Sequence, residues 1–420
     1  MTAEIAILNK YAVALAADSA VTISADDKEQ KIFDSGDKLF ELSRINPIGI
    51  MIYNGMDFVD VPLPVLIKKF RSKCSTFQTV KDAAFKFLEY LNSFGINAPD
   101  TTKESQIRKI VEPIVDRISK KYRVRVEEEI INDPKTSIKT ADDFRKISTQ
   151  IMTECIELYE RLLATRVDAS FVGKGRIKDD KVANDVIISI VGKYMRRFNE
   201  NLKNRVVTIG KLCLIKDMPS GVFTGLVIAG FGSDELFPTL ISFEIDGMVS
   251  GRLKYLERNF IDIDRSATRS LVVPFAQKEM VERFLYGLDE KIQRDVAGFC
   301  KEAVTDITKR VLDQIDFEDL SAKQSLKDDA KKGEDAFVRG LQERAFSAIR
   351  TQSQAEIEDM VEFMPKPELA RMAEALVNLT SIKRRVSRGV ETVGGPIDVA
   401  VISHAEDSCG LRESIIFPQN

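Results

Sequence analysis

The start of the chain brings together a hydroxyl, an amine and a carboxylate. Met1 is followed directly by Thr2, and Asp18 ends an apolar stretch further along. Removal of Met1 would leave Thr2 with a free α-amine, whose reference pKa of roughly 7.7–8.0 lets it accept the proton of the threonine hydroxyl. One residue would then supply both a nucleophile and its base. These residues predict nucleophilic attack on an acyl group.

Two short apolar strands are expected to position this end of the chain. Residues 5–8 are apolar, residues 9–10 are polar, and residues 12–17 form an almost unbroken apolar run. Apolar runs around a polar pair predict two buried strands joined by a tight turn. Such a hairpin would return Asp18 to the neighbourhood of Thr2.

Five segments, in order along the chain, resemble segments of proteasome-type peptidases, the proteasome β subunits and their bacterial relatives. They are Tyr11–Ser19, Lys38–Leu42, Met51–Gly55, residues 225–247 and residues 367–402. Proteins of this family are N-terminal nucleophile hydrolases. In them a threonine nucleophile is followed by an aspartate, by a lysine at the start of a later strand, and by a glycine whose backbone N–H binds the oxyanion.

The resemblance implies a role for four residues. Thr2 would attack an amide carbonyl, and its own amine would accept the proton, directly or through a water. Lys38 would lie beside the hydroxyl and favour loss of its proton, and Asp18 would pair with Lys38. The N–H of Gly55 would stabilise the oxyanion, which contributes about 3–4 kcal/mol in comparable sites. Water would then hydrolyse the acyl-enzyme.

The spacing of the lysine departs from the family. Lys38 lies four residues further from Asp18 than the family spacing, and Lys31 is a competing candidate on the near side of the same turn. We prefer Lys38 because the sequence Lys-Leu-Phe-Glu-Leu is typical of the start of a strand.

Other positions depart from the family as well. Ala20 stands where members often carry an arginine, and residues 273–277 replace a small, Ser-rich turn. In the family a serine and an aspartate usually support the terminal amine. Glu391 and Thr392 are the nearest substitutes for them in this chain. These departures leave open a subunit that has the fold without the activity.

The resemblance implies an α/β (α+β) fold, a four-layer αββα sandwich of the N-terminal nucleophile type with two helical insertions. Residues 1–60 would hold the hairpin and catalytic strands, residues 206–277 the second sheet, and residues 365–420 the last helix and strands. Residues 61–205 and 278–364 would be the helical regions.

Apolar residues at helical spacing support the first helical region. The stripes span Val80–Leu91, Ile107–Ile118, Phe144–Leu162 and Val186–Leu202. Thr79 is a plausible N-cap, and Pro113 is expected to kink or interrupt its helix.

The second helical region carries a stripe over residues 284–299, and its middle, residues 320–335, is rich in Lys, Asp, Gln and Ser. That composition favours a mobile, charged loop. The apolar stripes of both helical regions have two interpretations. They pack the helices of each insertion against one another, or they form a lid or a contact between subunits.

Two further motifs have simpler interpretations. Gly173-Lys-Gly175 lacks a following Ser or Thr and a preceding strand, so it does not qualify as a phosphate-binding loop. Lys383–Arg385 and Arg388 form a basic cluster at a predicted helix end, where cations complement the helix dipole.

The composition excludes several classes of function. A net charge of -3 with 30% charged residues argues against a general attraction to nucleic acid or to an anionic membrane. No apolar run approaches the length of a membrane span, and the start lacks the pattern of a signal peptide. We therefore expect a cytoplasmic protein.

Cysteine and histidine are scarce. The 5 cysteines are scattered without paired spacing, which is typical of free thiols in a reducing compartment. The single histidine, His404, follows a predicted strand and is expected to be structural or exposed. This scarcity excludes most Ser-His, Cys-His and zinc chemistries, and no metal or cofactor is expected.

Three functions remain. The first is a threonine peptidase in an oligomeric chamber, acting on peptides or proteins as a homo-oligomer and served by a separate ATPase or unfoldase. The second is an amidohydrolase for small substrates, because the same fold supports both chemistries. The third is a catalytically silent assembly subunit.

Overall fold

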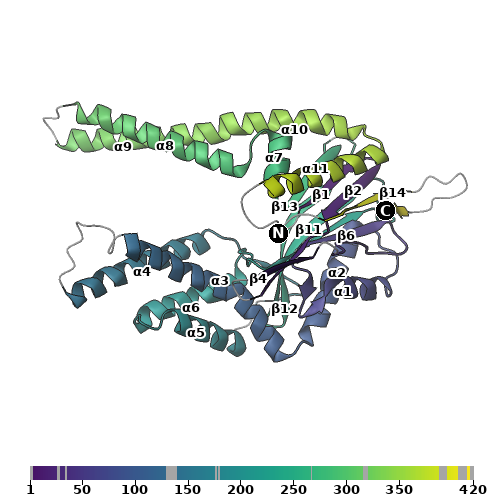
Figure 1. Ribbon diagram of the computed structural model, residues 1–420, viewed down its shortest axis with the longest axis horizontal. Helices are drawn as coiled ribbons and strands as arrows, with labels where there is room; N and C mark the ends of the chain where they lie inside the picture. The colour runs from purple at the N-terminus through teal and green to yellow at the C-terminus, as the bar shows by residue number, and fades with distance from the viewer. Residues whose placement is uncertain are drawn as a thin grey trace, which may run out of the picture. The chain divides into compact units, whose positions relative to one another are not determined.

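The chain forms two compact units, each with helices and antiparallel sheets, as the computed structural model shows (Figure 1). The structure describes residues 3–25, 29–33, 36–128, 140–175, 177, 180–265, 267–315, 320–386, 395–404 and 414–416. The first unit comprises residues 1–39, 263–404 and 415–420, and the second comprises residues 40–262 and 405–414. The mixture of helix and sheet confirms the predicted α/β (α+β) class.

The sheet of the first unit contains the predicted N-terminal hairpin. Its strands, in spatial order, are β13 (Ser270–Ala276), β1 (Ala3–Asn9), β2 (Ala12–Asp18), β14 (Ile397–Ser403) and β15 (Ser414–Ile416). The Oδ1 atom of Asn9 accepts hydrogen bonds from the backbone N–H groups of Tyr11 and Ala12 and closes the turn between β1 and β2. The two apolar runs therefore form the predicted tight hairpin.

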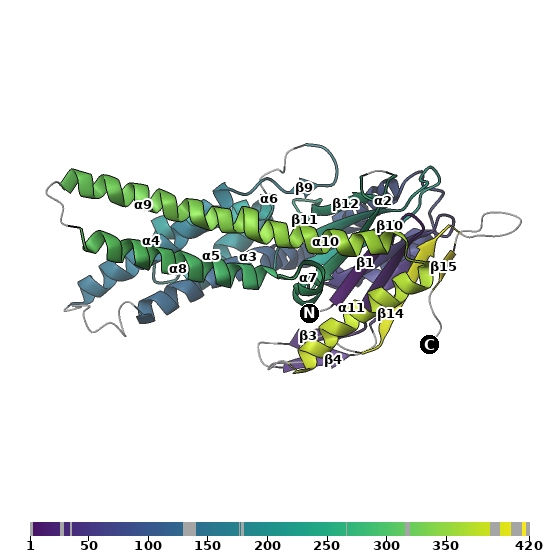
Figure 2. The same ribbon diagram turned by 90° about the horizontal axis from the view of Figure 1, so that it is seen from above.

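Helix α11 (Lys366–Val386) packs across β1, β2 and β14 (Figure 2). The contact is apolar and joins Ala3, Ile5, Ile7, Ala12, Ala14 and Ala16 of the strands to Leu369, Ala373, Leu376 and Val377 of the helix. Helix α7 (Glu279–Tyr286) packs against α11, helix α10 (Ser347–Glu362) packs against β13 and α7, and the two extend this layer. The segment predicted as the last core helix therefore covers one face of the sheet.

A helical arm extends from this unit (Figure 1). Helix α8 (Glu290–Asp313) packs against α9 (Leu320–Gly340), which continues through the π-helical turn η2 (Leu341–Phe346) into α10. The prediction of a mobile loop over residues 320–335 is wrong. Most of the charged side chains there are exposed on helix α9, and the half-buried positions Lys323, Ala330 and Glu334 recur at helical spacing.

The single stripe predicted over residues 284–299 is divided between two helices. Helix α7 ends at Gly287, which adopts a left-handed φ of 68° that favours glycine. Asp289 then caps α8, because its side chain accepts a hydrogen bond of 2.8 Å from the N–H of Ile292. These two capping residues end one helix and start the next inside one apolar pattern.

The second unit is built on a six-stranded sheet. Its strands, in spatial order, are β5 (Leu39–Glu41), β6 (Ile48–Asn54), β10 (Thr224–Gly230), β11 (Thr239–Val249), β12 (Arg252–Asp262) and β9 (Ser170–Phe171). A short hairpin of β7 (Asp57–Phe58) and β8 (Val61–Pro62) leads into α1 (Leu63–Arg71). Helix α2 (Val80–Ile96) packs on the sheet, and Thr79 caps it as predicted, accepting a hydrogen bond from Asp82 N.

Four helices form a separate apolar core in this unit. They are α3 (Asp100–Val126), α4 (Ala141–Ala164), α5 (Lys181–Tyr194) and α6 (Glu200–Ile215). Helix α3 runs through Pro113 without interruption, because its buried face offsets the one backbone hydrogen bond that proline removes. The apolar stripe predicted over residues 186–202 is divided between helices α5 and α6. Helix α6 begins after Asn199, whose side-chain oxygen accepts a hydrogen bond from the N–H of Leu202.

No helix in the described part of the chain combines the length and the apolar character that crossing a membrane requires.

Candidate active site

Lys38 and Asp18 form a buried ion pair at the start of β1. Lys38 Nζ donates a hydrogen bond of 2.7 Å to Asp18 Oδ1, and both residues are 0% exposed. The same oxygen accepts a hydrogen bond of 3.1 Å from the backbone N–H of Ala3. That nitrogen is bonded to the carbonyl carbon of Thr2, which itself lies outside the described residues. Asp18 thus connects Lys38 to the end of the chain that was predicted to react.

The sheet and one loop contact hold these groups together. Glu4 lies opposite Ala17 in the β1–β2 register, so β2 ends with Asp18 where β1 begins. Gly36 N–H donates a hydrogen bond of 2.9 Å to the carbonyl of Ser19, which brings the segment before β5 beside the end of β2. Lys38 lies in this segment.

Lys38 directly precedes β5, as its predicted position at the start of a strand requires. Lys31, the competing candidate, lies in β4 (Glu29–Phe33), which pairs with β3 (Val21–Ala25). The side chain of Lys31 lies outside the described residues. The predicted partnership with Asp18 is made by Lys38.

Glu4 is a site residue that the sequence analysis missed. Its Oε1 lies 3.3 Å from Lys38 Nζ, and the residue is 2% exposed. A single acidic residue inside the apolar run of residues 3–8 was the available signal, because a buried carboxylate requires a charged partner. Lys38 is therefore held between two carboxylates.

Asp398 is a second missed residue. Ser19 Oγ donates hydrogen bonds of 2.7 Å to the carbonyl of Pro396 and 3.5 Å to Asp398 Oδ2. Burial raises the pKa of the Asp398 carboxyl, the negative charge of Asp37 adds to that effect, and Ser19 and Lys38 oppose it. Glu391 and Thr392, the predicted substitutes, lie outside the described residues.

Gly55 belongs to the second unit and follows β6. Its N–H, the predicted oxyanion donor, donates a hydrogen bond of 3.2 Å to the carbonyl of Phe223. Asn54 Nδ2 donates to the same carbonyl at 2.6 Å. A Cβ atom on Gly55 would lie 2.2 Å from Thr224 Oγ1, so close packing is what requires glycine here. Oxyanion binding needs this N–H to leave Phe223.

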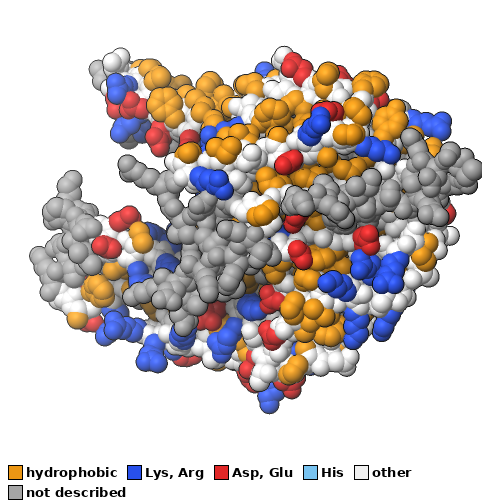
Figure 3. Space-filling view, turned by 45° about the vertical axis from the view of Figure 1, so that its right-hand side comes forward, with side chains coloured by type: hydrophobic (Ala, Val, Ile, Leu, Met, Phe, Trp, Pro, Cys, Tyr) orange, Lys and Arg blue, Asp and Glu red, His pale blue; other side chains and the backbone are white. Residues whose placement is uncertain are grey.

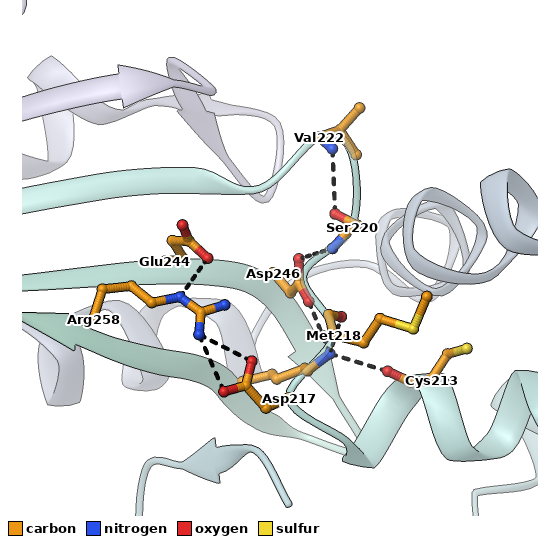
Figure 4. Close-up of polar contacts among 9 residues, drawn as sticks. Cys213, Asp217, Met218, Ser220, Val222, Glu244, Asp246 and Arg258 are labelled. Atoms are coloured by element: carbon orange, nitrogen blue, oxygen red, sulfur yellow. Dashed lines mark hydrogen bonds and ion pairs between the residues drawn. The ribbon is translucent and has the colours of Figure 1, made fainter. Parts of the chain in front are cut away.

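A second buried Lys–Asp pair in the second unit provides an internal comparison (Figure 4). Lys254 Nζ donates to Asp246 Oδ2 at 2.8 Å, to the carbonyl of Cys213 at 3.0 Å and to the carbonyl of Met218 at 3.2 Å. The other oxygen of Asp246 accepts from Ser220 N at 2.8 Å. With three acceptors this ammonium is fully satisfied, and it anchors the end of α6 to the sheet.

Lys38 is less completely surrounded than Lys254. Within the described part of the chain its ammonium has only two acidic partners, Asp18 and Glu4. One of its three N–H groups is therefore available to a further oxygen. In this respect the surroundings of Lys38 differ from those of Lys254.

No protein-family model matches the chain, and no curated protein matches it significantly. Among the described residues, no group of three or more His, Cys, Asp and Glu side chains could hold a metal ion. The geometry around Lys38 is therefore the observation on which a function can be based.

Proposed function

We propose that the protein is an N-terminal threonine hydrolase that cleaves amide bonds, as a proteasome-like peptidase. The observation that carries the proposal is the buried ammonium of Lys38, fixed by Asp18, whose carboxylate also accepts the N–H of Ala3. A cation held beside the first described residue of β1 favours the deprotonated form of a hydroxyl that reaches it.

The mechanism needs Met1 to be removed. The hydroxyl oxygen of Thr2 then attacks the amide carbonyl, and its proton passes to the α-amine of the same residue. The ammonium of Lys38 stabilises the negative charge that develops on the hydroxyl oxygen, and Asp18 keeps the lysine in place. The α-ammonium then gives this proton to the nitrogen of the substrate, the C–N bond breaks and the amine leaves, and water hydrolyses the ester that remains.

The proposed architecture is the four-layer αββα sandwich. Its support is that each unit has an antiparallel sheet with helices on it, α11 on the first sheet and α2 on the second. The residues of β1 and β2 that do not contact α11 are also largely apolar in sequence, and a sheet that is apolar on both faces needs cover on both.

The proposed setting is a cytoplasmic homo-oligomer that encloses its active sites and receives peptide or protein substrates from a separate ATPase or unfoldase. The four cysteines that the structure describes are free thiols, which suits a reducing compartment. Large apolar side chains are exposed on α4 and α8, which suits contacts between subunits. An amidohydrolase for small substrates uses the same chemistry without the chamber.

A catalytically silent assembly subunit is the second candidate function. The observation that favours it is the hydrogen bond from Gly55 N–H to the carbonyl of Phe223, because an N–H in use cannot bind an oxyanion.

Intact mass and turnover test the proposal together. The expected results are loss of Met1, hydrolysis of peptides in a fluorogenic panel, and no hydrolysis by the folded Thr2→Ala variant. Thr22→Ala is the matched control, since it removes a threonine hydroxyl from β3 and leaves residue 2 intact. Retention of Met1, or equal turnover by Thr2→Ala, refutes the nucleophile.

A further inference from the structure

Two helices and a turn of the second unit bring exposed basic side chains together. Helices α1 and α2 contact each other (Figure 1), and Phe77, in the chain between them, donates a backbone hydrogen bond of 2.8 Å to Asn46 Oδ1 in the turn before β6. The surface around this contact carries exposed cations. We call the following set the basic corner: Arg44, Lys68, Lys69, Lys73 and Lys86.

Phe77 and Cys74 connect the members of the basic corner. Lys86 Nζ lies 5.3 Å from the centre of the Phe77 ring, and that ring stacks on Phe70 of α1. Burial raises the pKa of the Cys74 thiol, and the positive charge of Lys86 opposes this increase. Lys86 of α2 therefore lies close to the place where α1 ends.

Carboxylates do not balance the charge of the basic corner. Residues 61–81 contain no Asp or Glu, and Glu41 on β5 is already bound by Arg71 at 3.0 Å. In the described part of the chain, no side chain of the basic corner forms an ion pair. By contrast, the exposed lysines Lys120 and Lys332 each pair with an aspartate on their own helix. The basic corner is therefore an unbalanced cluster of positive charge.

The helix dipole accounts for only part of this cluster. Lys68 and Lys69 lie in the last turn of α1 or beside it, where cations are favourable. Lys86 lies inside α2 and Arg44 precedes β6, so neither is explained in this way. Because the whole chain has a net charge of -3, the basic corner is a local region of positive potential on a negatively charged protein. A negatively charged partner would relieve the repulsion among these cations.

The surroundings of the cations favour a polypeptide as this partner. Ile45 is 51% exposed and Val65 is 53% exposed, and Val65 shares a helix surface with the lysines three and four positions after it. Arginine, the usual choice for phosphate and nucleic-acid recognition, is represented only by Arg44. Lysines beside exposed apolar side chains suit a chain that carries carboxylates and apolar residues together.

We propose that the basic corner is a docking surface for an acidic segment of a partner protein. Carboxylates of that segment pair with the exposed lysines, and an apolar side chain beside them packs on Ile45 or Val65. Complementary charge of this kind raises the rate of association and selects the partner. The inference concerns binding alone and does not rest on the proposed hydrolase activity.

Fluorescence anisotropy with a labelled acidic peptide tests this surface. The probe is a peptide of about 15 residues, mostly glutamate with a leucine near its middle. The wild-type chain should bind it saturably at about 20 mM salt and more weakly at about 200 mM, because screening weakens contacts between exposed charges. The double variant Lys73→Glu/Lys86→Glu reverses one charge after α1 and one in α2, and it should bind at least about 10-fold more weakly. Each single variant should show part of this loss, since both lysines belong to one surface.

Lys327→Glu/Lys331→Glu is the matched control. It makes the same change in net charge at two exposed lysines of α9, so its affinity for the peptide should stay within about twofold of the wild type. Both double variants should melt within about 2 °C of the wild type, because exposed side chains contribute little to stability.

Other results overturn the inference. A wild-type chain that does not bind the peptide, or an equal loss of affinity in the control, shows that the basic corner is not a specific docking surface. Tighter binding of a labelled single-stranded oligonucleotide of equal charge, weakened by the same variants, assigns the surface to nucleic acid instead. A lower mass of Lys73→Glu/Lys86→Glu than of the wild type in light scattering assigns it to a second copy of this chain.

Discussion

Lys38 and Lys254 are both buried and each pairs with an aspartate, but their other contacts differ. This difference yields the first prediction. Lys38→Met leaves two buried carboxylates without their cation, so the free energy of unfolding should fall by about 3–5 kcal/mol and hydrolysis by the folded fraction should be abolished. Lys254→Met should destabilise the protein similarly and leave hydrolysis by the folded fraction unchanged. Denaturant titration and peptide turnover measure the two effects.

Lys31→Met is the control for the choice of lysine. It should change neither turnover nor stability by a large amount. If Lys31→Met abolishes turnover and Lys38→Met does not, the catalytic lysine has been assigned to the wrong side of the turn.

Asp398 yields a prediction about pH. Burial raises the pKa of its carboxyl in the folded state, so folding disfavours the charged form of this group relative to the unfolded chain. This relative preference for the neutral form stabilises the protein below the ordinary aspartate pKa of about 3.9 and is lost as pH rises through the folded-state value. Asp398→Asn should therefore melt at a higher temperature than the wild type at pH 7, and the difference should close in acid. A difference that persists below pH 3 contradicts the assignment.

At the scale of the elements, the turn of the N-terminal hairpin is the structure that positions Asp18. Buried Asn9 accepts from Tyr11 and Ala12, and its Nδ2 donates to the carbonyls of Val361 at 3.0 Å and Met364 at 2.9 Å. Asn9→Ala should lower the free energy of unfolding by about 2–4 kcal/mol, because buried backbone groups lose their partners. Thermal or denaturant unfolding measures it.

Asn97→Ala is the matched control for this prediction. Its side chain donates to the carbonyl of Ser93 at the exposed end of α2, so the change should stay within about 0.5 kcal/mol. Equal losses in the two variants contradict the structural role of Asn9.

The N-terminal hairpin was predictable because the apolar runs of residues 5–8 and 12–17 lie on either side of one polar pair, a local signal that tertiary contacts reinforce. The division of the two apolar stripes, one into α7 and α8 and the other into α5 and α6, was not predictable. The helical spacing of apolar residues continues across each break, and only the capping residues Asp289 and Asn199 mark where the second helix begins. Helix α9 was missed because its charged composition resembles that of a loop, while its sparse apolar positions carry the helical period.

The site was predictable only in part, for a related reason. Asp18 and Lys38 came from a motif along the sequence, and their contact confirms that the two belong together. Glu4 could have been found from its isolated charge. Asp398 could not, because β14 brings it beside β2 from the far end of the chain, and only the register of these strands shows that.

At the scale of the whole molecule, exposed apolar side chains predict self-association. On α4, Leu158 is 42% exposed and Leu162 38%; on α8, Phe299 is 72% exposed and Ile307 61%. Figure 3 shows hydrophobic side chains at the surface along the arm of α8 to α10. Helices with apolar residues facing solvent are typical of protein contacts. Light scattering should therefore give a mass several times that of the 47.2 kDa chain.

Charge placed on these helices tests which of them makes the contact. Leu158→Glu should lower the mass without lowering the melting temperature, because the side chain is not part of the buried core of α3 to α6. Phe299→Glu tests the arm in the same way. Gln150→Glu is the matched control, since it adds the same charge to an exposed position of α4 whose side chain is polar already, and it should leave the mass unchanged. A wild-type chain that is monomeric at micromolar concentration excludes the oligomeric chamber and favours the amidohydrolase for small substrates.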